Sequence, residues 1–435
     1  MRLCDDVAAV EGKHMRWIML SAGLAACQGT PTWHQDVRPI VEGRCLSCHD
    51  TGGVAPFGLA TWEDAASISA LMSASVQARS MPPWSAADVR AYSNDHSLTD
   101  EQIATIVDWV GGGAPEGDPE TPGEPLVPVA TALPRVDLSV GMTEPYDPSG
   151  DPDDYRCFVM DWPAQTDGFV TGFEPIPGNG ELVHHIAAFL VRPDNLAGTS
   201  AFDQIRGWDA ASEGPGYGCF GGPGSSEAEE DLRAPIQQLA QWVPGAGAFV
   251  FPQGSGIEVP AGSMVVLQVH YFDQADGTDQ TRIDFMTSPT VERRGAFAPW
   301  LNATWPLGNM TIPAGGSTDV EQVADPREFW QLMTGGLDLE AGFDVHAAMM
   351  HMHTRGVAGS AWLVREDGDE EWLLKVDDYD FDWQLNYLLA EPARFLPGDQ
   401  LGVECVFENT GDTDLNWGEG TLDEMCVANL YVTEL

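Results

Sequence analysis

The sequence predicts a mainly β fold of the β-sandwich type, preceded by a small all-α unit. From about residue 135 onward, short alternating apolar segments are separated by Gly, Pro and Asp, as at 182–191, 263–272 and 400–407. This pattern is typical of strands joined by turns. Helix-like apolar spacing precedes it, and residues 118–134 in between are rich in Pro and Gly, which predicts a linker. A chain of 435 residues is too long for one core, so we expect two or three domains.

The composition restricts the kinds of partner. Hydrophobic residues make up 43% of the chain, which excludes a largely disordered protein. With 20 basic and 67 acidic residues, the formal net charge is −47. We therefore expect no nucleic acid partner and no binding to an anionic membrane surface, whereas cationic partners or substrates would be attracted.

Residues 1–27 carry the features of an export signal. A positive charge at Arg16 is followed by a short apolar run and then by small residues. The run ends in Leu24-Ala25-Ala26-Cys27, which resembles the lipobox of bacterial lipoproteins, in which the cysteine is lipidated. It is too short for a permanent transmembrane helix. We expect an exported periplasmic or cell-surface lipoprotein of a bacterium, in contact with the membrane only through its lipid anchor and free to form disulfides.

A C-x-x-C-H motif predicts covalently bound haem. It reads Cys45-Leu46-Ser47-Cys48-His49. Two thiols at this spacing can bond to the vinyl groups of a haem, and the adjacent histidine supplies an axial ligand to the iron. The alternatives are a chance C-x-x-C pair and a zinc site. In an exported chain haem c is favoured, and residues 28–117 then resemble a small helical cytochrome c domain.

Met81 is the predicted sixth ligand of the haem iron. Two prolines follow it, and they stop a helix and make a rigid loop. Met72 is the alternative, but it lies in a helix-like run and is expected in the core. His/Met ligation predicts a haem that carries electrons and does not bind oxygen. A capping-box pattern at Thr99 predicts the start of the helix that closes the unit.

His351 and His353 form the first of two histidine clusters. On a strand, residues two apart point to the same face, so both imidazoles could bind one metal ion. Met425, next to Cys426, could supply a thioether as a third ligand. Two imidazoles and a soft sulfur suit copper that cycles through Cu(I). The alternative is an exposed strand pair of histidines, with Met425 in the core.

The second cluster contains His184, His185 and His270. Neighbours on a regular strand point to opposite faces, so His184 and His185 could share a metal only at a strand end or where the backbone is irregular. Otherwise one would be a core histidine and the other a surface histidine. His270 shares a strand face with Gln268, which could support it by hydrogen bonding. The alternative for His270 is a core histidine, and His346 is assigned no role.

Six motifs between about residue 137 and residue 435 occur in the order seen in one enzyme family. They are Asp154-Tyr155-Arg156-Cys157, Val183-His184-His185, Gln268-Val269-His270-Tyr271, His351-Met352-His353, Pro397-Gly398-Asp399 and Asp423-Glu424-Met425-Cys426. Through these motifs the chain resembles the copper type II ascorbate-dependent monooxygenases. The resemblance implies two jelly-roll-like β-sandwich domains, at 135–290 and 291–435, that face each other across a cleft.

The resemblance also implies two copper ions and two disulfides. The ligands of an electron-transfer copper are matched by His184, His185 and His270. Those of an oxygen-activating copper, which are also the candidate catalytic residues, are matched by His351, His353 and Met425. The remaining cysteines are expected to pair as Cys157 with Cys219 and Cys405 with Cys426.

The activity implied is hydroxylation of a C–H bond in a small organic or peptide-like substrate with dioxygen. An external donor, ascorbate or a redox protein, would supply the electrons, and we expect the haem to relay them to copper. Peptide-hydroxylating members carry an arginine where this chain has Met349, so amidation of glycine-extended peptides is not expected. Two alternatives remain: a cupin-like mononuclear metal oxygenase, and a non-catalytic electron-transfer lipoprotein that binds copper and haem.

Overall fold

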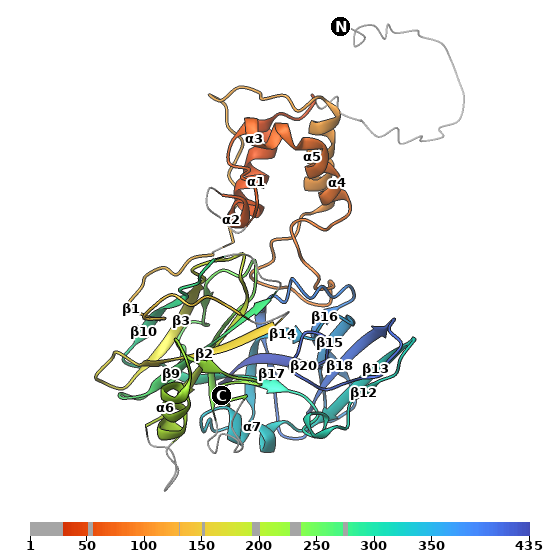
Figure 1. Cartoon of the computed structure of the whole chain (residues 1–435). Coiled ribbons are helices and arrows are strands. Elements are labelled where there is room, and N and C mark those ends of the chain that lie inside the picture. The colour runs from red at the N-terminus through yellow and green to blue at the C-terminus, as the bar shows by residue number, and fades with distance from the viewer. Residues whose placement is uncertain are drawn as a thin grey trace, which may run out of the picture.

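The computed structural model describes residues 29–50, 55–129, 131–149, 153–193, 201–226, 236–272 and 277–435. The predicted export signal and Cys27 lie outside these residues. Figure 1 shows a small helical unit above a larger β body. The prediction of a mainly β chain is confirmed. Over the described ranges, no helix has both the length and the apolar character needed to cross a bilayer.

The helical unit packs short helices around a small aromatic core. Its elements are η1 (Trp33–Val37), α1 (Arg38–Arg44), α2 (Leu46–His49), α3 (Trp62–Ser67), α4 (Ser69–Gln77) and α5 (Asp100–Gly111). Trp33 and Trp109 are buried at its centre, with ring centroids 6.0 Å apart. The predicted capping box is confirmed, because Thr99 Oγ1 accepts the Gln102 N–H and Gln102 Oε1 accepts the Thr99 N–H.

The first sandwich consists of two facing layers of strands that share one apolar core. One layer has the order β5-β2-β9-β4-β6. Its strands are β2 (Asp153–Asp161), β4 (Val183–Val191), β5 (Tyr217–Gly218), β6 (Gln237–Trp242) and β9 (Met264–Phe272). The facing strands are β1 (Leu138–Gly141), β3 (Gly168–Ile176), β7 (Phe249–Val250), β8 (Ser255–Val259) and β10 (Arg282–Ser288). Helix α6 (Ala201–Ala211) packs against β2.

The second sandwich repeats this arrangement in the C-terminal part of the chain. One layer contains β11 (Arg293–Trp300), β14 (Phe343–His351), β17 (Tyr387–Phe395) and β20 (Val427–Glu434). The other contains β13 (Gly316–Ala324), β15 (Gly356–Val364), β16 (Glu370–Val376) and β18 (Gln400–Asn409). Four short elements complete it: η2 (Trp305–Leu307), β12 (Thr311–Ile312), α7 (Arg327–Met333) and β19 (Leu415–Asn416).

One continuous sheet joins the two sandwiches. β8 and β11 pair in parallel, with Arg293 opposite Ser255, so the sheet runs β1-β10-β3-β8-β11-β20-β14-β17. Ala347 and Tyr431 of the second sandwich are buried in the core of the first. The shared sheet and core fix the two sandwiches against each other.

Residues 84–96, which we call the strap, pack on the second sandwich. Ala86 pairs with Val376 and Tyr92 with Leu389 in isolated β-bridges. The Tyr92 ring is buried in the core of the second sandwich, and its hydroxyl donates to the Leu373 carbonyl at 3.2 Å. The strap falls inside the range predicted as an all-α domain. It departs from that expectation because its aromatic side chains find their burial against strands.

The Pro- and Gly-rich residues 118–134 contact both the helical unit and the β body. Gln35 Nε2 donates to the Asp118 carbonyl at 2.6 Å and to the Thr121 carbonyl at 2.8 Å. Further along, the Ala248 N–H donates to the Thr131 carbonyl at 2.8 Å. The predicted linker is therefore hydrogen-bonded to the folded parts at both of its ends.

Candidate metal centres and haem pocket

A β-bulge turns His184 and His185 toward the same place. β4 and β9 pair Val183 with Tyr271 and His185 with His270, so His184 is the extra residue of the bulge. The Nδ1 atoms of His184 and His185 lie 3.4 Å apart, and those of His185 and His270 lie 3.3 Å apart. Imidazole nitrogens each ~2.0 Å from one metal ion have about this spacing. The irregular backbone that shared ligation requires is present.

Neighbouring groups set the orientation and the protonation state of the imidazoles of His184, His185 and His270. His270 Nε2 donates to Asp153 Oδ1 at 2.8 Å, which leaves its Nδ1 facing the other two rings. Tyr155 stacks on His270, with centroids 3.9 Å apart and an interplanar angle of 6°. Burial lowers the pKa of His184 to about 3 and lowers the pKa of His185 well below its ordinary value. Both rings are therefore neutral at neutral pH and able to bind a metal.

His351 is the last residue of β14 and His353 follows two residues beyond it, with their ring centroids 5.2 Å apart. His351 Nδ1 donates to Gln384 Oε1 at 2.6 Å, and His353 Nδ1 donates to the Asp423 carbonyl at 3.2 Å. Both rings therefore keep Nε2 as the nitrogen available to a metal. Burial lowers the pKa of both imidazoles, to about 3 for His353. The alternative of an exposed strand pair is wrong, since His353 is only 3% exposed.

The strand register brings the segment that carries Met425 next to the segment that carries His351 and His353. His351 is paired with Val427 in the antiparallel ladder of β14 and β20. The ladder ends at this pair, and His353 and Met425 each lie two residues outside it, on the segments that extend the two strands. Met425 is buried, and the Glu424 carboxylate beside it accepts the backbone N–H of His353 at 2.9 Å. The loop that carries the thioether is thus fixed to the histidine pair.

Two disulfides lie next to the two clusters, and both expected pairs are confirmed. They join Cys157 with Cys219 and Cys405 with Cys426. The first bond contacts Gln268, whose Nε2 lies 3.5 Å from Cys219 Sγ, and Gln268 is two residues before His270 on β9. The second bond directly follows Met425 in the chain. Each disulfide is therefore placed to fix the backbone of one cluster.

The two clusters lie close together at the junction of the sandwiches. The ring centroids of His185 and His351 are 6.4 Å apart. Phe381 stacks on His184 at 4.5 Å and lies edge-on to His353 at 6.1 Å. The candidate ligands from the two sandwiches therefore share one region of the protein.

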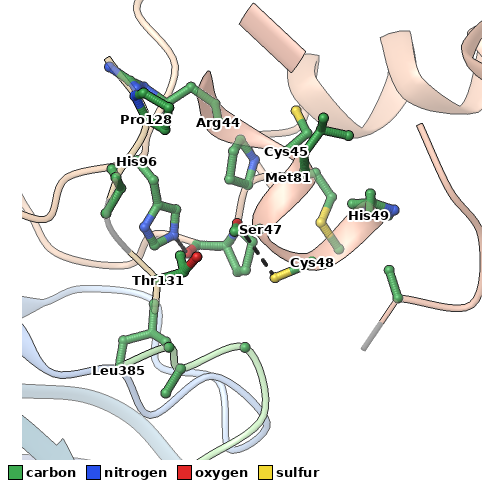
Figure 2. A pocket seen from close by; sticks show the side chains of 18 of the residues that line it. Arg44, Cys45, Ser47, Cys48, His49, Met81, His96, Pro128, Thr131 and Leu385 are labelled. Atoms are coloured by element: carbon green, nitrogen blue, oxygen red, sulfur yellow. Dashed lines mark hydrogen bonds between the residues drawn. The ribbon is translucent and has the colours of Figure 1, made fainter. Parts of the chain in front are cut away.

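A cavity of about 810 Å³ lies between the helical unit and the β body. Ligand and cofactor sites are commonly ~300–1,000 Å³ in volume. The cavity is lined by all the residues predicted to hold a haem, namely Cys45, Cys48, His49 and Met81. Figure 2 shows these four residues on one side of the cavity, with His96, Thr131 and Leu385 on the other.

The C-x-x-C-H residues all line this cavity. His49 Nδ1 donates to the Phe57 carbonyl at 3.0 Å, which leaves Nε2 for an iron. Burial raises the pKa of Cys45 to about 12 and also raises the pKa of Cys48. Among the residues that the structure describes, the two thiols and His49 do not converge as a metal-binding trio. Met72 also lines the cavity but is packed in the helical core.

Some residues at these sites have no sequence signal of their own. Asp153 accepts from His270 and also from the Thr421 hydroxyl at 2.6 Å, so it ties the first sandwich to the loop that carries Met425. Phe381 and Gln384 come from a segment without a recognisable motif. Asp153 directly precedes the Asp154-Tyr155-Arg156-Cys157 motif, and this position is the one signal that could have pointed to it.

The fold and sites define a class of protein: a metalloprotein with histidine clusters at the junction of two β-sandwiches. Residues 142–277 match the family model described as copper type II ascorbate-dependent monooxygenase, N-terminal domain. Residues 330–433 match the model of the C-terminal domain of the same family. The two matches together cover more than half of the chain. The chain therefore belongs to the copper type II ascorbate-dependent monooxygenase family.

Several curated animal proteins are similar to this chain. Dopamine beta-hydroxylase of Equus caballus is 27% identical over 296 residues, which cover 63% of this chain and 43% of that protein. Dopamine beta-hydroxylase of Homo sapiens is 28% identical over 297 residues, 63% of this chain and 42% of that protein. DBH-like monooxygenase protein 1 of Mus musculus is 25% identical over 367 residues, 78% of this chain and 55% of that protein. The chain thus spans about half the length of the curated relatives it matches.

Proposed function

We propose that the chain is a copper-dependent monooxygenase that uses dioxygen to hydroxylate a C–H bond of a small organic or peptide-like substrate. The observation that carries the proposal is the convergence of His184, His185 and His270 with His351 and His353, in a chain of the copper monooxygenase family. Copper bound at these sites would supply one-electron redox chemistry and the activation of dioxygen.

In this proposal the chain holds two copper ions with two sets of side chains. The electron-transfer copper is held through the Nδ1 atoms of His184, His185 and His270. The oxygen-activating copper is held by Met425 and by the Nε2 atoms of His351 and His353. The support is that each of His270, His351 and His353 has its other nitrogen engaged by a protein acceptor, which leaves the named atom free.

We propose further that residues 28–117 bind haem c and pass electrons to copper. Cys45 and Cys48 form the thioether bonds, and His49 and Met81 are the axial ligands. The support is a cavity lined by all four residues that is also lined by residues of the β body, including Gln241 and Trp383. An external donor, ascorbate or a redox protein, would reduce the haem.

The substrate we favour is a small aromatic amine. Relatives named dopamine beta-hydroxylase and tyramine beta-hydroxylase make such amines the first to test. A net charge of −47 attracts a cationic substrate. Met349 is buried, and its sulfur lies 3.5 Å from Gln241 Nε2, so this position does not offer the arginine of peptide-hydroxylating members.

An exported location is part of the proposal. The two disulfides in the described residues suit an oxidising compartment. We place the chain in the periplasm or on the cell surface of a bacterium, anchored through lipidated Cys27, with monooxygenase domains at 135–290 and 291–435. Palmitate labelling of the expressed chain, lost on Cys27→Ser, tests the anchor; undiminished labelling of that variant would remove it.

Oxygen uptake tests the activity. Copper- and haem-loaded protein is supplied with a reductant and a panel of aromatic amines, peptides and lipids, and we expect substrate-dependent oxygen uptake with a hydroxylated product. Metal analysis should give two coppers and one haem per chain. One non-haem iron in place of copper would favour the cupin-like alternative, and copper without substrate-dependent uptake would favour an electron-transfer lipoprotein.

Met425→Ile is the matched variant for this assay. Isoleucine is also apolar but has no sulfur, so a soft ligand of the oxygen-activating copper is removed. The variant should keep the haem spectrum and lose hydroxylation. A fully active Met425→Ile protein would exclude Met425 from the site.

A further inference from the structure

Residues 381–386, which we call the bridging segment, touch the haem cavity and both histidine clusters. We propose that the bridging segment carries electrons from the haem to the copper held by His184, His185 and His270, through Trp383 on the cavity side and Phe381 on the copper side. The inference rests on the proposed function, because it requires haem and copper to be bound.

The cavity end of the bridging segment is formed by Trp383, Leu385 and Asn386, all of which line the cavity that holds the C-x-x-C-H motif. The Trp383 ring packs directly on Gly245, where an added Cβ would lie 2.7 Å from the ring. Gly245 also has a φ of +79°, so both its backbone and the close ring contact favour glycine. Trp383 is therefore an aromatic group held in a fixed place on the cavity wall.

The copper end of the bridging segment is Phe381. Its ring stacks on His184 with centroids 4.5 Å apart and an interplanar angle of 23°. His184 Nε2 is buried and has no hydrogen-bond partner within the described ranges, so the outer part of this imidazole is supported by packing against Phe381. Gln384 reaches the other cluster, because its Oε1 accepts from His351 Nδ1 at 2.6 Å.

Hydrogen bonds within the bridging segment keep its two ends at a fixed separation. Gln384 Nε2 donates to the Phe381 carbonyl at 2.9 Å. The Trp383 N–H donates to the Asp380 carbonyl at 3.0 Å, and the Leu385 N–H donates to the Trp383 carbonyl at 3.1 Å. The two aromatic groups thus stand two residues apart in one hydrogen-bonded turn, which offers a short route through covalent bonds and packed rings.

The proposed step moves one electron. Ferrous haem iron is oxidised to ferric iron and one cupric ion is reduced to cuprous copper, with no bond made or broken and no proton required. The external donor then reduces the haem again. The first acceptor is the copper of His184, because Phe381 is stacked on His184 but meets His353 only edge-on at 6.1 Å.

The experiment follows electron transfer without substrate turnover. Holoprotein with ferric haem and Cu(II) receives one electron equivalent per chain under anaerobic conditions. Stopped-flow absorbance follows the decay of ferrous haem, and freeze-quench EPR follows the loss of Cu(II). The variants are Phe381→Leu, Trp383→Leu and the conservative Trp383→Phe. The matched control is Trp372→Leu, which removes a tryptophan that packs on Trp362 at 5.5 Å and does not line the haem cavity.

We expect Phe381→Leu and Trp383→Leu to slow haem oxidation several-fold, and Trp383→Leu to do so with the haem spectrum, both reduction potentials and the copper content unchanged. Trp383→Phe should recover most of the rate, and Trp372→Leu should match the wild type. Equal rates in the wild type and both Trp383 variants would overturn the proposed route. The two Trp383 variants test the route by themselves if Phe381→Leu loses copper. Failure of ferrous haem in the wild type to reduce copper would instead overturn the proposed haem relay.

Discussion

At the scale of single residues, three of the five candidate copper-binding histidines are oriented through the nitrogen that faces away from the metal site. Asp153 does this for His270, and Gln384 does it for His351. His184 is held differently, by ring stacking and a bulged backbone. Since the ligand's own ring is unchanged when such a partner is replaced, these neighbours can be tested separately from the ligands.

Asp153→Ala should weaken copper binding at the cluster of His184, His185 and His270. The substitution removes the acceptor of His270 Nε2, and losing such a partner commonly costs ~10–100-fold in metal affinity. Copper titration with EPR detection measures the effect. Asp161→Ala is the control, since Asp161 is at the other end of β2 and pairs with Arg206 on the surface. Equal copper affinity in Asp153→Ala and the wild type would show that His270 is oriented by other groups.

His346 should make the fold more sensitive to acid. Burial, followed by the charge of Arg293, lowers the pKa of His346 to about 4, whereas the unfolded chain titrates near 6.5. As the pH falls from 6.5 toward 4, His346 binds a proton in the unfolded state but not in the folded state. The free energy of unfolding therefore falls, by no more than about 1.4 kcal/mol per pH unit.

Replacing His346 with glutamine, which does not titrate, should remove this share of the pH dependence. Urea unfolding of the wild type and His346→Gln at several pH values from 7.5 to 4.5 gives the difference between the two proteins, in which groups common to both cancel. The wild type should lose more stability below pH 6.5, and the two should run parallel above pH 7. Parallel curves throughout would mean that His346 titrates alike in the folded and unfolded chain.

At the scale of elements, each disulfide should support the cluster beside it. Opening Cys405–Cys426, which are 21 residues apart, should cost about 3 kcal/mol, and opening Cys157–Cys219, 62 apart, about 4 kcal/mol in the chain-entropy model. Cys405→Ala with Cys426→Ala should preferentially weaken copper at the Met425 site. Cys157→Ala with Cys219→Ala should preferentially weaken copper at the other site. EPR of each protein measures this, and equal losses at both sites in both proteins would contradict it.

Elements whose signal is local could be predicted from the sequence, and those that depend on distant contacts could not. The helix cap at Thr99 and the strand at His351 follow from neighbouring residues. The sequence showed that His184 and His185 could share a metal only where the backbone is irregular. The position of the bulge at His184 depends on the pairing of β4 with β9 and could not be predicted. The packing of the strap could not be predicted, because Trp84 and Tyr92 give the same sequence pattern whether they pack on helices or on strands. Phe381 was missed because only the folded chain brings it to the histidines.

At the scale of the whole molecule, the helical unit is attached to the β body on two sides. The strap pairs with the second sandwich through Ala86 and Tyr92. Residues 118–134 are hydrogen-bonded to the helical unit at Asp118 and to the first sandwich at Thr131. The cavity between them, which we propose for the haem, is lined from both parts. The proposed haem and copper sites therefore belong to one body, and on that proposal electrons should pass between them within a single molecule.

Transfer within one molecule predicts a rate constant for haem oxidation that is independent of protein concentration. It also predicts little dependence on salt. Transfer between molecules would behave differently: each carries a net charge of −47, so collisions are opposed by repulsion that salt screens, and added salt would speed the reaction. Stopped-flow measurements over a wide range of protein and salt concentration separate the two cases. A rate that rises in proportion to protein concentration and increases with salt would show that the haem serves the copper of another molecule.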